Sequence, residues 1–471
     1  MNITLKRAVM AAITGTALLG YGANAMADAT FDLVQALVDK GLLTEEEALP
    51  LMKSRANDEE KQVKKEKSNP TLKVGKKGLV IKNPNGDFSI KLGGRMHADY
   101  TNHYGDSDLA VKNKPTNGTQ IRRGRIALSG TVYNDYDYMI ETDFANDGVA
   151  VKDLLLVYHG FDLATPLELT VGHQKHAMSM EIQESSNDIM FTERSFVSGL
   201  TTPFFDRAIG ANLKTFGDNW NVQSGIYGDS MGSSFDSSKS SSDTTPDNEG
   251  RGFGLRGTWA PINEKDKVLH LGADYGYRKA SDDGYSNSQP DNRFRYRTTN
   301  MSNLPVVDAK LADMDNVKTA IFELSGMYGP LSFQSEYAKS NVSRKTNVDA
   351  DFSAWYAQVG YTLTGESRTY KGSDGEFKRL SPKKEFSLKN GGWGAWEVAA
   401  RYDEIDLQDG IVAGGEAKRM TLSLNWYLNE DVRILAGYSK SFDLSGGALK
   451  NADGSFADDI DVISMRTQWA F

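Results

Sequence analysis

Three arginines stand almost side by side in the stretch QIRRGRIALSGTV, which begins at Gln120: Arg122, Arg123 and Arg125. A guanidinium group is planar, stays charged at any working pH and donates two parallel hydrogen bonds to a carboxylate or a phosphate. The cluster therefore suits the binding of oxyanions. The alternative is that each arginine pairs with an acid of the protein and stiffens the fold.

The residues that follow the cluster predict a β-strand. An apolar row of Ile126, Leu128 and Val132 alternates with small polar side chains. Successive side chains of a strand point to opposite faces, so the apolar row would face one side and Arg123 and Arg125 the other. Arg122 is out of phase with this pattern, and we expect it near the outer end of its strand.

The same two-residue period runs through the chain from 86 to 471. Most alternating segments are about ten residues long, which is long for a soluble strand but right for a tilted strand that crosses a membrane. Short turns alternate with long polar loops, and aromatic residues gather at the segment ends, as in outer-membrane barrels. We therefore predict an all-β fold, a transmembrane antiparallel β-barrel of about 16 strands. The long connection 365–392 is an exception, because it falls on the side of the short turns.

The first 27 residues predict a signal peptide. Lys6 and Arg7 precede an apolar run over 8–20, and Ala25-Met26-Ala27 is a plausible cleavage site. No later run approaches the ~18 apolar residues of a membrane helix. The chain of 471 residues has no cysteine and a net charge of -9, which argues against a nucleic-acid partner.

Residues 28–69 predict a short helical arm on the periplasmic side, of helical or coiled-coil type. Apolar residues recur there at helical spacing, and Thr44 with Glu47 forms a plausible capping box. A flexible tether is the alternative. We read 70–85 as a linker between the arm and the barrel.

Two short motifs resemble catalytic signatures but have the wrong context. GFGLRG over 252–257 lies within an alternating run with no helix to receive a phosphate, and GDSMG over 228–232 opens a polar loop. His173 and His176 have no third ligand at metal-binding spacing. We therefore expect no enzyme activity, no cofactor and no metal.

If the apolar rows face lipid, the alternating polar residues face the lumen. The basic candidates for an anion path on the strands are Lys91, Arg95, Arg122, Arg123, Arg125, Arg256, Arg401 and Arg419. Acids share the same face, so a network of ion pairs across the lumen is the alternative for each of them. These acids are Asp99, Asp137, Glu141, Asp143, Asp274, Glu323 and Asp403.

The third outer loop, 175–206, is unusually apolar for an exposed loop. It carries four phenylalanines between 191 and 205 and three methionines between 178 and 190. A loop of this composition would not lie in water, so we expect it to fold into the barrel and form a constriction. Lys175 and Arg194 belong to this loop and complete the candidate anion path.

Several long segments resemble the phosphate-selective porin O and P family of Gram-negative outer membranes. They include QIRRGRIALSGTVYNDYDYMIETDFA, VGHQK, FTERSF, GAWEVAARYDEIDL, LSLNWYLNEDVRILAGYSK and the terminal SMRTQWAF. The resemblance implies a sixteen-stranded trimeric porin whose inward loop and basic residues guide anions such as phosphate or polyphosphate. It also implies that Phe471, with Trp469 and Met465, is the signal read by the barrel assembly machinery. This chain has His176-Ala177-Met178 where the family usually has a Pro-Phe pair.

The sequence thus predicts a passive outer-membrane channel for small anions that is embedded in lipid as a homotrimer. A general diffusion porin, or a non-conducting barrel that serves as an adhesin or scaffold, is the alternative.

Overall fold

A computed structural model describes most of the chain. The described residues are 35–50, 69–75, 78–105, 108–145, 148–231, 249–279, 293–302, 304–311 and 313–471. The predicted signal peptide, 1–27, lies outside them, as do 28–34 and 51–68 of the predicted arm. The chain divides into two compact units, Met1–Thr71 with Asn83–Asn85 and Leu72–Lys82 with Gly86–Phe471.

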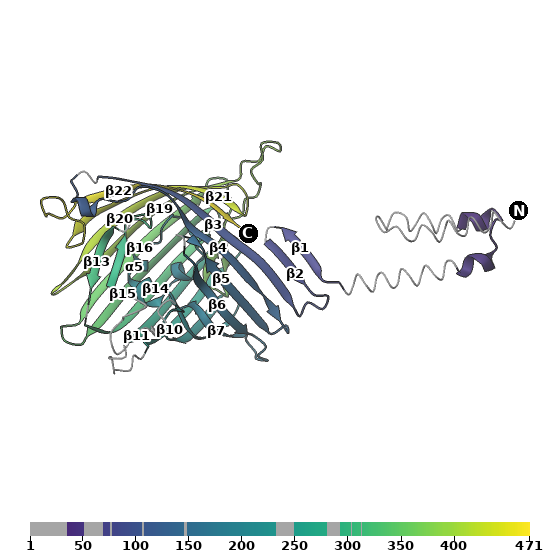
Figure 1. The fold of residues 1–471 in the computed structure, drawn as a ribbon, viewed down its shortest axis with the longest axis horizontal. Helices are drawn as coiled ribbons and strands as arrows, with labels where there is room; N and C mark the ends of the chain where they lie inside the picture. Colours follow the sequence, from purple (N-terminus) through teal and green to yellow (C-terminus); the bar gives the residue numbers. More distant parts are fainter. Residues whose placement is uncertain are drawn as a thin grey trace. The chain divides into compact units, whose positions relative to one another are not determined.

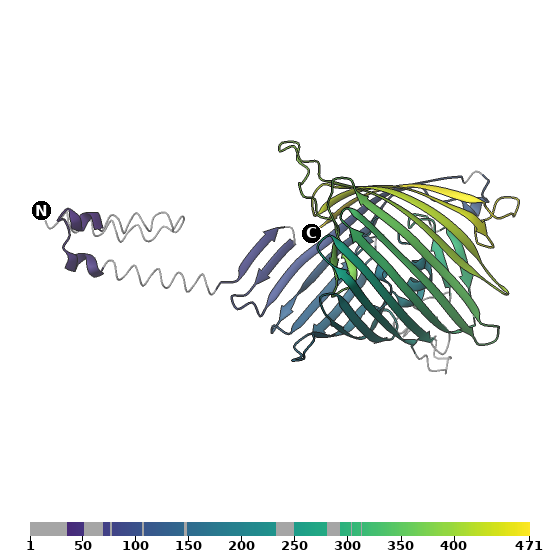
Figure 2. The same cartoon turned by 180° about the vertical axis from the view of Figure 1, so that it is seen from behind.

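The second unit is a closed antiparallel β-barrel (Figures 1 and 2). Eighteen described strands belong to one sheet, and all but β1 and β2 form the barrel wall, which gives the sixteen strands that the alternation predicts. The last strand pairs with the first wall strand and closes the barrel. The wall strands are β3 (Ser89–Tyr104), β4 (Gly118–Val132), β5 (Tyr136–Asp143), β6 (Ala150–Tyr158), β7 (Leu167–Lys175), β8 (Arg207–Phe216), β9 (Trp220–Tyr227), β10 (Arg251–Asn263), β11 (Lys267–Lys279), β14 (Met314–Tyr328), β15 (Leu331–Arg344), β16 (Ala350–Thr362), β19 (Ala395–Asp409), β20 (Val412–Tyr427), β21 (Val432–Ser445) and β22 (Asp459–Ala470).

The wall strands turn apolar side chains outward and polar ones inward. On β14, Phe322 is 63% exposed and Leu324 44%, whereas Glu323 between them is 3% exposed. An apolar outer face suits contact with lipid, and a polar inner face suits a lumen that contains water. Closure of the barrel leaves no unpaired sheet edge in the membrane. No helix among the described residues is long and apolar enough to cross a membrane.

The stretch 70–85, expected to be a linker, contains two strands, β1 (Thr71–Gly75) and β2 (Gly78–Lys82). β2 pairs with the beginning of β3, with Ile81 opposite Ile90 and Lys82 opposite Ser89. This pairing is possible because β22 covers β3 only from Arg95 onward and leaves the first residues of β3 with an open edge.

Four connections contain further elements. The first outer loop contains the 3-10 helix η2 (Val111–Asn113), and the third contains α4 (Met180–Gln183) and α5 (Val197–Phe205). The outer loop between β11 and β14 contains β12 (Arg293–Arg297) and β13 (Pro305–Lys310). The connection between β16 and β19 contains β17 (Thr369–Lys371) and β18 (Glu376–Lys378). This last connection lies at the end of the barrel that holds the short turns, as the strand order of the sequence predicts.

An apolar core lies against the inner face of the barrel. It joins Leu200 and Phe204 of α5 to Phe294 of β12, Val307 of β13 and wall residues such as Ile405. By its composition, 280–316 is one of the long polar loops that alternate with the short turns, and it was expected to lie outside the barrel. Its described part is instead built into this core, because Phe294 and Tyr296 alternate with arginines and can turn inward together.

In the first unit, residues 35–39 and 45–50 are helical. The amide of Thr44 donates to Glu47 Oε2 at 3.0 Å, and the amide of Glu47 donates to Thr44 Oγ1 at 3.3 Å. This reciprocal pair confirms the predicted capping box.

Candidate functional site

A β-bulge turns two consecutive arginines of β4 toward the lumen. His97 pairs with Arg123 and Ala98 with Ile121, so Arg122 is an extra residue in the register of β3 on β4. A bulge of this kind re-aims a side chain that simple alternation would place on the other face. Arg122 Nε consequently lies 3.3 Å from Glu193 Oε1 of the third outer loop.

Arg123 is a buried wall arginine whose guanidinium group is not fully paired. It is 9% exposed, and neither its Nε nor its Nη1 has a hydrogen-bond partner in the described part of the chain. An unpaired buried cation is costly, and an anion that enters its surroundings would relieve that cost.

Arg95 and Arg125 share one acid of the wall. Arg95 Nη2 lies 2.6 Å from Glu141 Oε2, and Arg125 Nη1 lies 2.7 Å from Glu141 Oε1. Arg125 Nε is also 2.8 Å from Asp143 Oδ2. These two guanidinium groups are therefore largely occupied by protein carboxylates.

Arg256 joins the wall to the connection between β16 and β19. Its Nε lies 2.9 Å from Glu323 Oε1, and its Nη1 and Nη2 donate to the carbonyls of Asp374 and Gly375 at 3.0 and 2.8 Å. Arg256 has no exposed surface. It is placed to hold this connection against the barrel.

Arg401 and Arg419 hold the third outer loop against the wall. Both pair with Asp403, at 3.5 Å from Arg401 Nε and 2.9 Å from Arg419 Nε to its carboxylate oxygens. Their guanidinium groups also lie over rings of the loop, 4.5 Å from the centroid of Phe191 and 4.3 Å from that of Phe196.

Lys175 and Arg194 shape the loop itself. Lys175 Nζ donates to the carbonyls of Ile182 and Gln183 at 2.7 and 2.8 Å, and Arg194 Nη2 donates to that of Glu184 at 2.9 Å. Both side chains are thus engaged with backbone oxygens of the loop. Lys91, by contrast, is half-buried near the end with the short turns.

Three arginines that were not predicted from the sequence line a basic cavity. Phe294 and Tyr296 of β12 pack into the core, so Arg293, Arg295 and Arg297 lie on the opposite side of that strand. Together with Arg122 they line a cavity of about 440 Å³, hereafter the arginine cavity. The alternation of arginines with aromatic residues in RFRYR could have revealed this two-sided strand in the sequence.

The arginine cavity carries an excess of positive charge. Its lining has four arginines and two acids, Glu193 and Asp206. Arg293 pairs with Asp308, whereas Arg295 and Arg297 form no ion pair with any residue that the structure describes. Burial, followed by the like charges of Arg295 and Arg122, lowers the pKa of Arg297.

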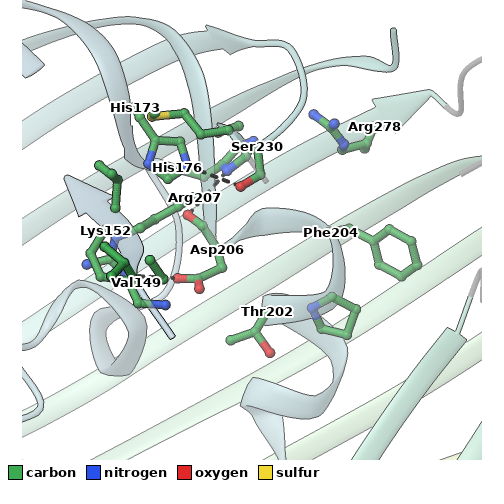
Figure 3. Close-up of a pocket in the computed structure, with 15 residues that line it drawn as sticks. Val149, Lys152, His173, His176, Thr202, Phe204, Asp206, Arg207, Ser230 and Arg278 are labelled. Carbon is green, nitrogen blue, oxygen red and sulfur yellow. Dashed lines mark hydrogen bonds and ion pairs between the residues drawn. The ribbon is translucent and has the colours of Figure 1, made fainter. Parts of the chain in front are cut away.

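A second cavity, of about 490 Å³, is shown in Figure 3. It shares Thr202, Pro203 and Asp206 with the arginine cavity, so the two adjoin at the C-terminal end of α5. We call it the histidine cavity, because His173 and His176 line it along with cations from three strands. These cations are Lys152, Arg207 and Arg278.

His173 Nε2 lies 3.1 Å from Ser230 Oγ, which brings the serine of the GDSMG motif to a histidine. Among the residues that the structure describes, His173 Nδ1 has no hydrogen-bond partner, so no carboxylate orients this ring in the way that a catalytic triad requires. Within the described ranges, no group of three His, Cys, Asp or Glu side chains could hold a metal ion.

Comparison with known proteins places this arrangement among porins. A family model for the phosphate-selective porin O and P proteins matches residues 90–471. Porin O of Pseudomonas aeruginosa is 30% identical over 432 residues, which cover 84% of this chain and 91% of that protein. An uncharacterized protein of Caulobacter vibrioides is 26% identical and covers 82% of this chain and 75% of its own length. Among solved structures, the anion-selective porin from Comamonas acidovorans is 12% identical with a TM-score of 0.48, covering 82% of this chain and 100% of that chain.

Proposed function

Because this chain belongs to the phosphate-selective porin O and P family, and is therefore an outer-membrane channel rather than an enzyme, we propose that it conducts small anions passively, phosphate or polyphosphate among them. The single observation that supports this choice is the arginine cavity. Arg295 and Arg297 bring positive charge to it without a matching protein carboxylate among the described residues.

The arginine cavity lies where a passing anion would gain the most. In a narrow space that is partly shielded from water, a guanidinium group attracts an anion more strongly than it would in bulk solvent. The path that we propose runs from Arg295 and Arg297 past Arg122 and Arg123, with Lys91 toward the periplasmic end.

The remaining predicted path residues fit a supporting role better. We propose that Arg95, Arg125, Arg256, Arg401 and Arg419 brace the wall, since each has a carboxylate of a wall strand within 3.5 Å. The carboxylate next to Arg122 belongs instead to the third outer loop. Lys175 and Arg194 would fix the shape of the third outer loop through its carbonyls. Both roles that the sequence allowed are thus present: some of the basic residues would line the anion path, and the others would stabilise the wall or the loop.

The deciding experiment is the zero-current potential of the purified protein in a planar bilayer across a KCl gradient, followed by addition of phosphate. We expect an anion-selective potential and a chloride current that phosphate blocks. The double variant Arg295→Gln with Arg297→Gln should shift the potential toward cations and weaken the block. Lys112→Gln, which removes one cation from an exposed site in an outer loop, should do neither.

Two results would overturn this proposal in different ways. If the double variant keeps the potential of the unmodified protein, the chain is a general diffusion porin. If the protein gives no stable channel steps, it is a scaffold or an adhesin.

We also propose that the protein assembles as a homotrimer in outer-membrane lipid, with Phe471 as the residue read by the assembly machinery. The amide of Phe471 donates to Gly94 O at 3.0 Å, and its ring stacks on Trp469 with centroids 4.6 Å apart. Chemical cross-linking of membranes should give a trimer band. Phe471→Ala should reduce the amount of folded protein in the outer membrane, and unchanged assembly would exclude this role.

A further inference from the structure

We propose that the histidine cavity is a binding site for a small oxyanion that carries a hydroxyl group, of which hydrogen phosphate is the smallest example. This inference deepens the proposed function, because it assigns a second anion site at the same mouth of the channel.

The charge of the cavity favours an anion. Arg207 is held by Asp153, with a distance of 2.9 Å from Nε to Oδ1, and Arg278 is paired with Asp229. Lys152, which also lines the cavity, has no ion pair with the part of the chain that the structure describes. An anion could therefore take Lys152 as its counter-charge without breaking an existing pair.

His176 supplies a hydrogen-bond acceptor that has no donor. Its Nδ1 lies 3.4 Å from the carbonyl oxygen of Asp206, and because a carbonyl only accepts, Nδ1 must carry the proton. Burial, followed by the charge of Arg278, lowers the pKa of His176 to about 3, so the ring is neutral at pH 7. Nε2 then carries a lone pair and can only accept a hydrogen bond, and it has no hydrogen-bond partner within the described residues.

The ring of His176 is held in place by its neighbours. Its centroid lies 3.9 Å from that of Tyr227 and 5.7 Å from that of Phe205, and the residue is 2% exposed. A fixed and desolvated acceptor discriminates strongly, because a ligand without a donor leaves it unpaired.

The cavity is large enough and open enough for such a ligand. Its volume of about 490 Å³ lies within the usual range for small-molecule sites, about 300–1,000 Å³. Val149 lies at its lining and is 73% exposed, which provides access from outside. In Figure 3, His173, His176, Asp206 and Ser230 gather together, with Lys152 to one side and Arg278 to the other.

These features predict that the histidine cavity binds phosphate in preference to sulfate. At pH 7 inorganic phosphate still carries at least one hydroxyl, whereas sulfate has a similar size and charge but no hydroxyl. Phosphate can donate to His176 Nε2 while its charged oxygens accept from Lys152. Sulfate has no hydrogen to donate, so its oxygen lone pairs would face the lone pair of His176 Nε2.

The test is calorimetric titration of the purified full-length protein with inorganic phosphate and with sulfate at pH 7. To isolate this site, the titrations are repeated in the Arg295→Gln with Arg297→Gln background. We expect phosphate to bind about tenfold more tightly than sulfate, the worth of one hydrogen bond to a charged group. The preference should persist in this background.

Three variants locate the preference. His176→Phe keeps a ring against Tyr227 but removes the acceptor, and it should abolish the preference for phosphate over sulfate. His176→Gln places a carbonyl oxygen near the position of Nε2 and should restore part of it. Lys152→Met should weaken the binding of both anions.

Equal binding of the two anions by the unmodified protein, or a preference that survives in a folded His176→Phe variant, would overturn the inference. The anion selectivity of the channel is measured separately as the zero-current potential. A failure of this site alone leaves that potential anion-selective, whereas failure of the proposed function removes it.

Discussion

Arg466 on the last strand and Asp99 on the first wall strand form a two-pronged ion pair, with Nε–Oδ1 and Nη2–Oδ2 distances of 2.7 Å each. The two residues stand directly opposite each other in the register of β22 on β3. Their side chains are 0% and 5% exposed. Because a slip of one residue would turn either partner to the other face, the pair selects the register in which the barrel closes.

Asp99→Ala should destabilise the barrel strongly, because it leaves the guanidinium of Arg466 buried without its counter-charge. The expected loss in the free energy of unfolding is about 3–5 kcal/mol. Thermal unfolding followed by circular dichroism measures this change. The double variant Asp99→Leu with Arg466→Met removes both charges and should regain most of the loss. A single variant as stable as the unmodified protein would show that the pair does not hold the seam.

The sequence predicted the barrel wall well, because alternation is a local property. Each strand shows on its own which residues face the lumen, and the inward placement of Arg466 or Glu323 follows from that alone. The partner of each arginine could not be predicted in this way. Asp99 is 367 residues from Arg466, and their meeting depends on the register of the whole barrel.

The site was less predictable than the wall, for two physical reasons. The bulge at Arg122 breaks the two-residue period at the arginine cluster itself, so alternation misplaces that residue. Arg295 and Arg297 lie in a loop whose polar flanks hide a short alternating strand. Only the core that receives Phe294 and Tyr296 explains why this strand turns inward, and that core is assembled from distant segments.

Glu193→Gln should increase the anion selectivity of the channel. Burial disfavours the charged carboxylate, but Arg122, Arg466 and Arg123 outweigh it and lower the pKa of Glu193 to about 2, so the group is ionised at pH 7. Its neutralisation removes one of the two acids that line the arginine cavity.

The zero-current potential across a KCl gradient should therefore move further toward the chloride limit. Asp453→Asn makes the same change in charge at an exposed site, where solvent and salt screen it, and should have little effect. A shift of equal size in both variants would mean that the potential reports total charge rather than the cavity.

Glu184→Gln should flatten the decline in stability at alkaline pH. Burial raises the pKa of Glu184 to about 8 from an ordinary value of 4.5, although Arg368, 3.6 Å away, opposes the shift. Because the folded pKa lies above the unfolded one, the stabilisation is complete below the unfolded pKa and is lost as the pH rises through about 8.

The thermal midpoint of the unmodified protein should accordingly fall between pH 7 and pH 9 more steeply than that of Glu184→Gln. Asp188 and Glu376 also act to raise the pKa of Glu184, while Arg194 acts to lower it, so the comparison must change Glu184 alone. Parallel curves for the two proteins would mean that Glu184 does not titrate in this range.

Lys175→Met separates an anchoring role from a role in the anion path. The variant leaves the carbonyls of Ile182 and Gln183 without their shared donor, and each hydrogen bond from a charged group is worth about 1.5–3 kcal/mol. The loop around α4 should then move more freely. We expect more frequent sub-levels in single-channel recordings with an unchanged zero-current potential. Lys175→Arg keeps a donor near both carbonyls and should show no increase in sub-levels. If Lys175→Met instead shifts the potential toward cations without adding sub-levels, Lys175 faces the permeating anions, as its place in the predicted inward loop suggested, and the loop is held by other contacts.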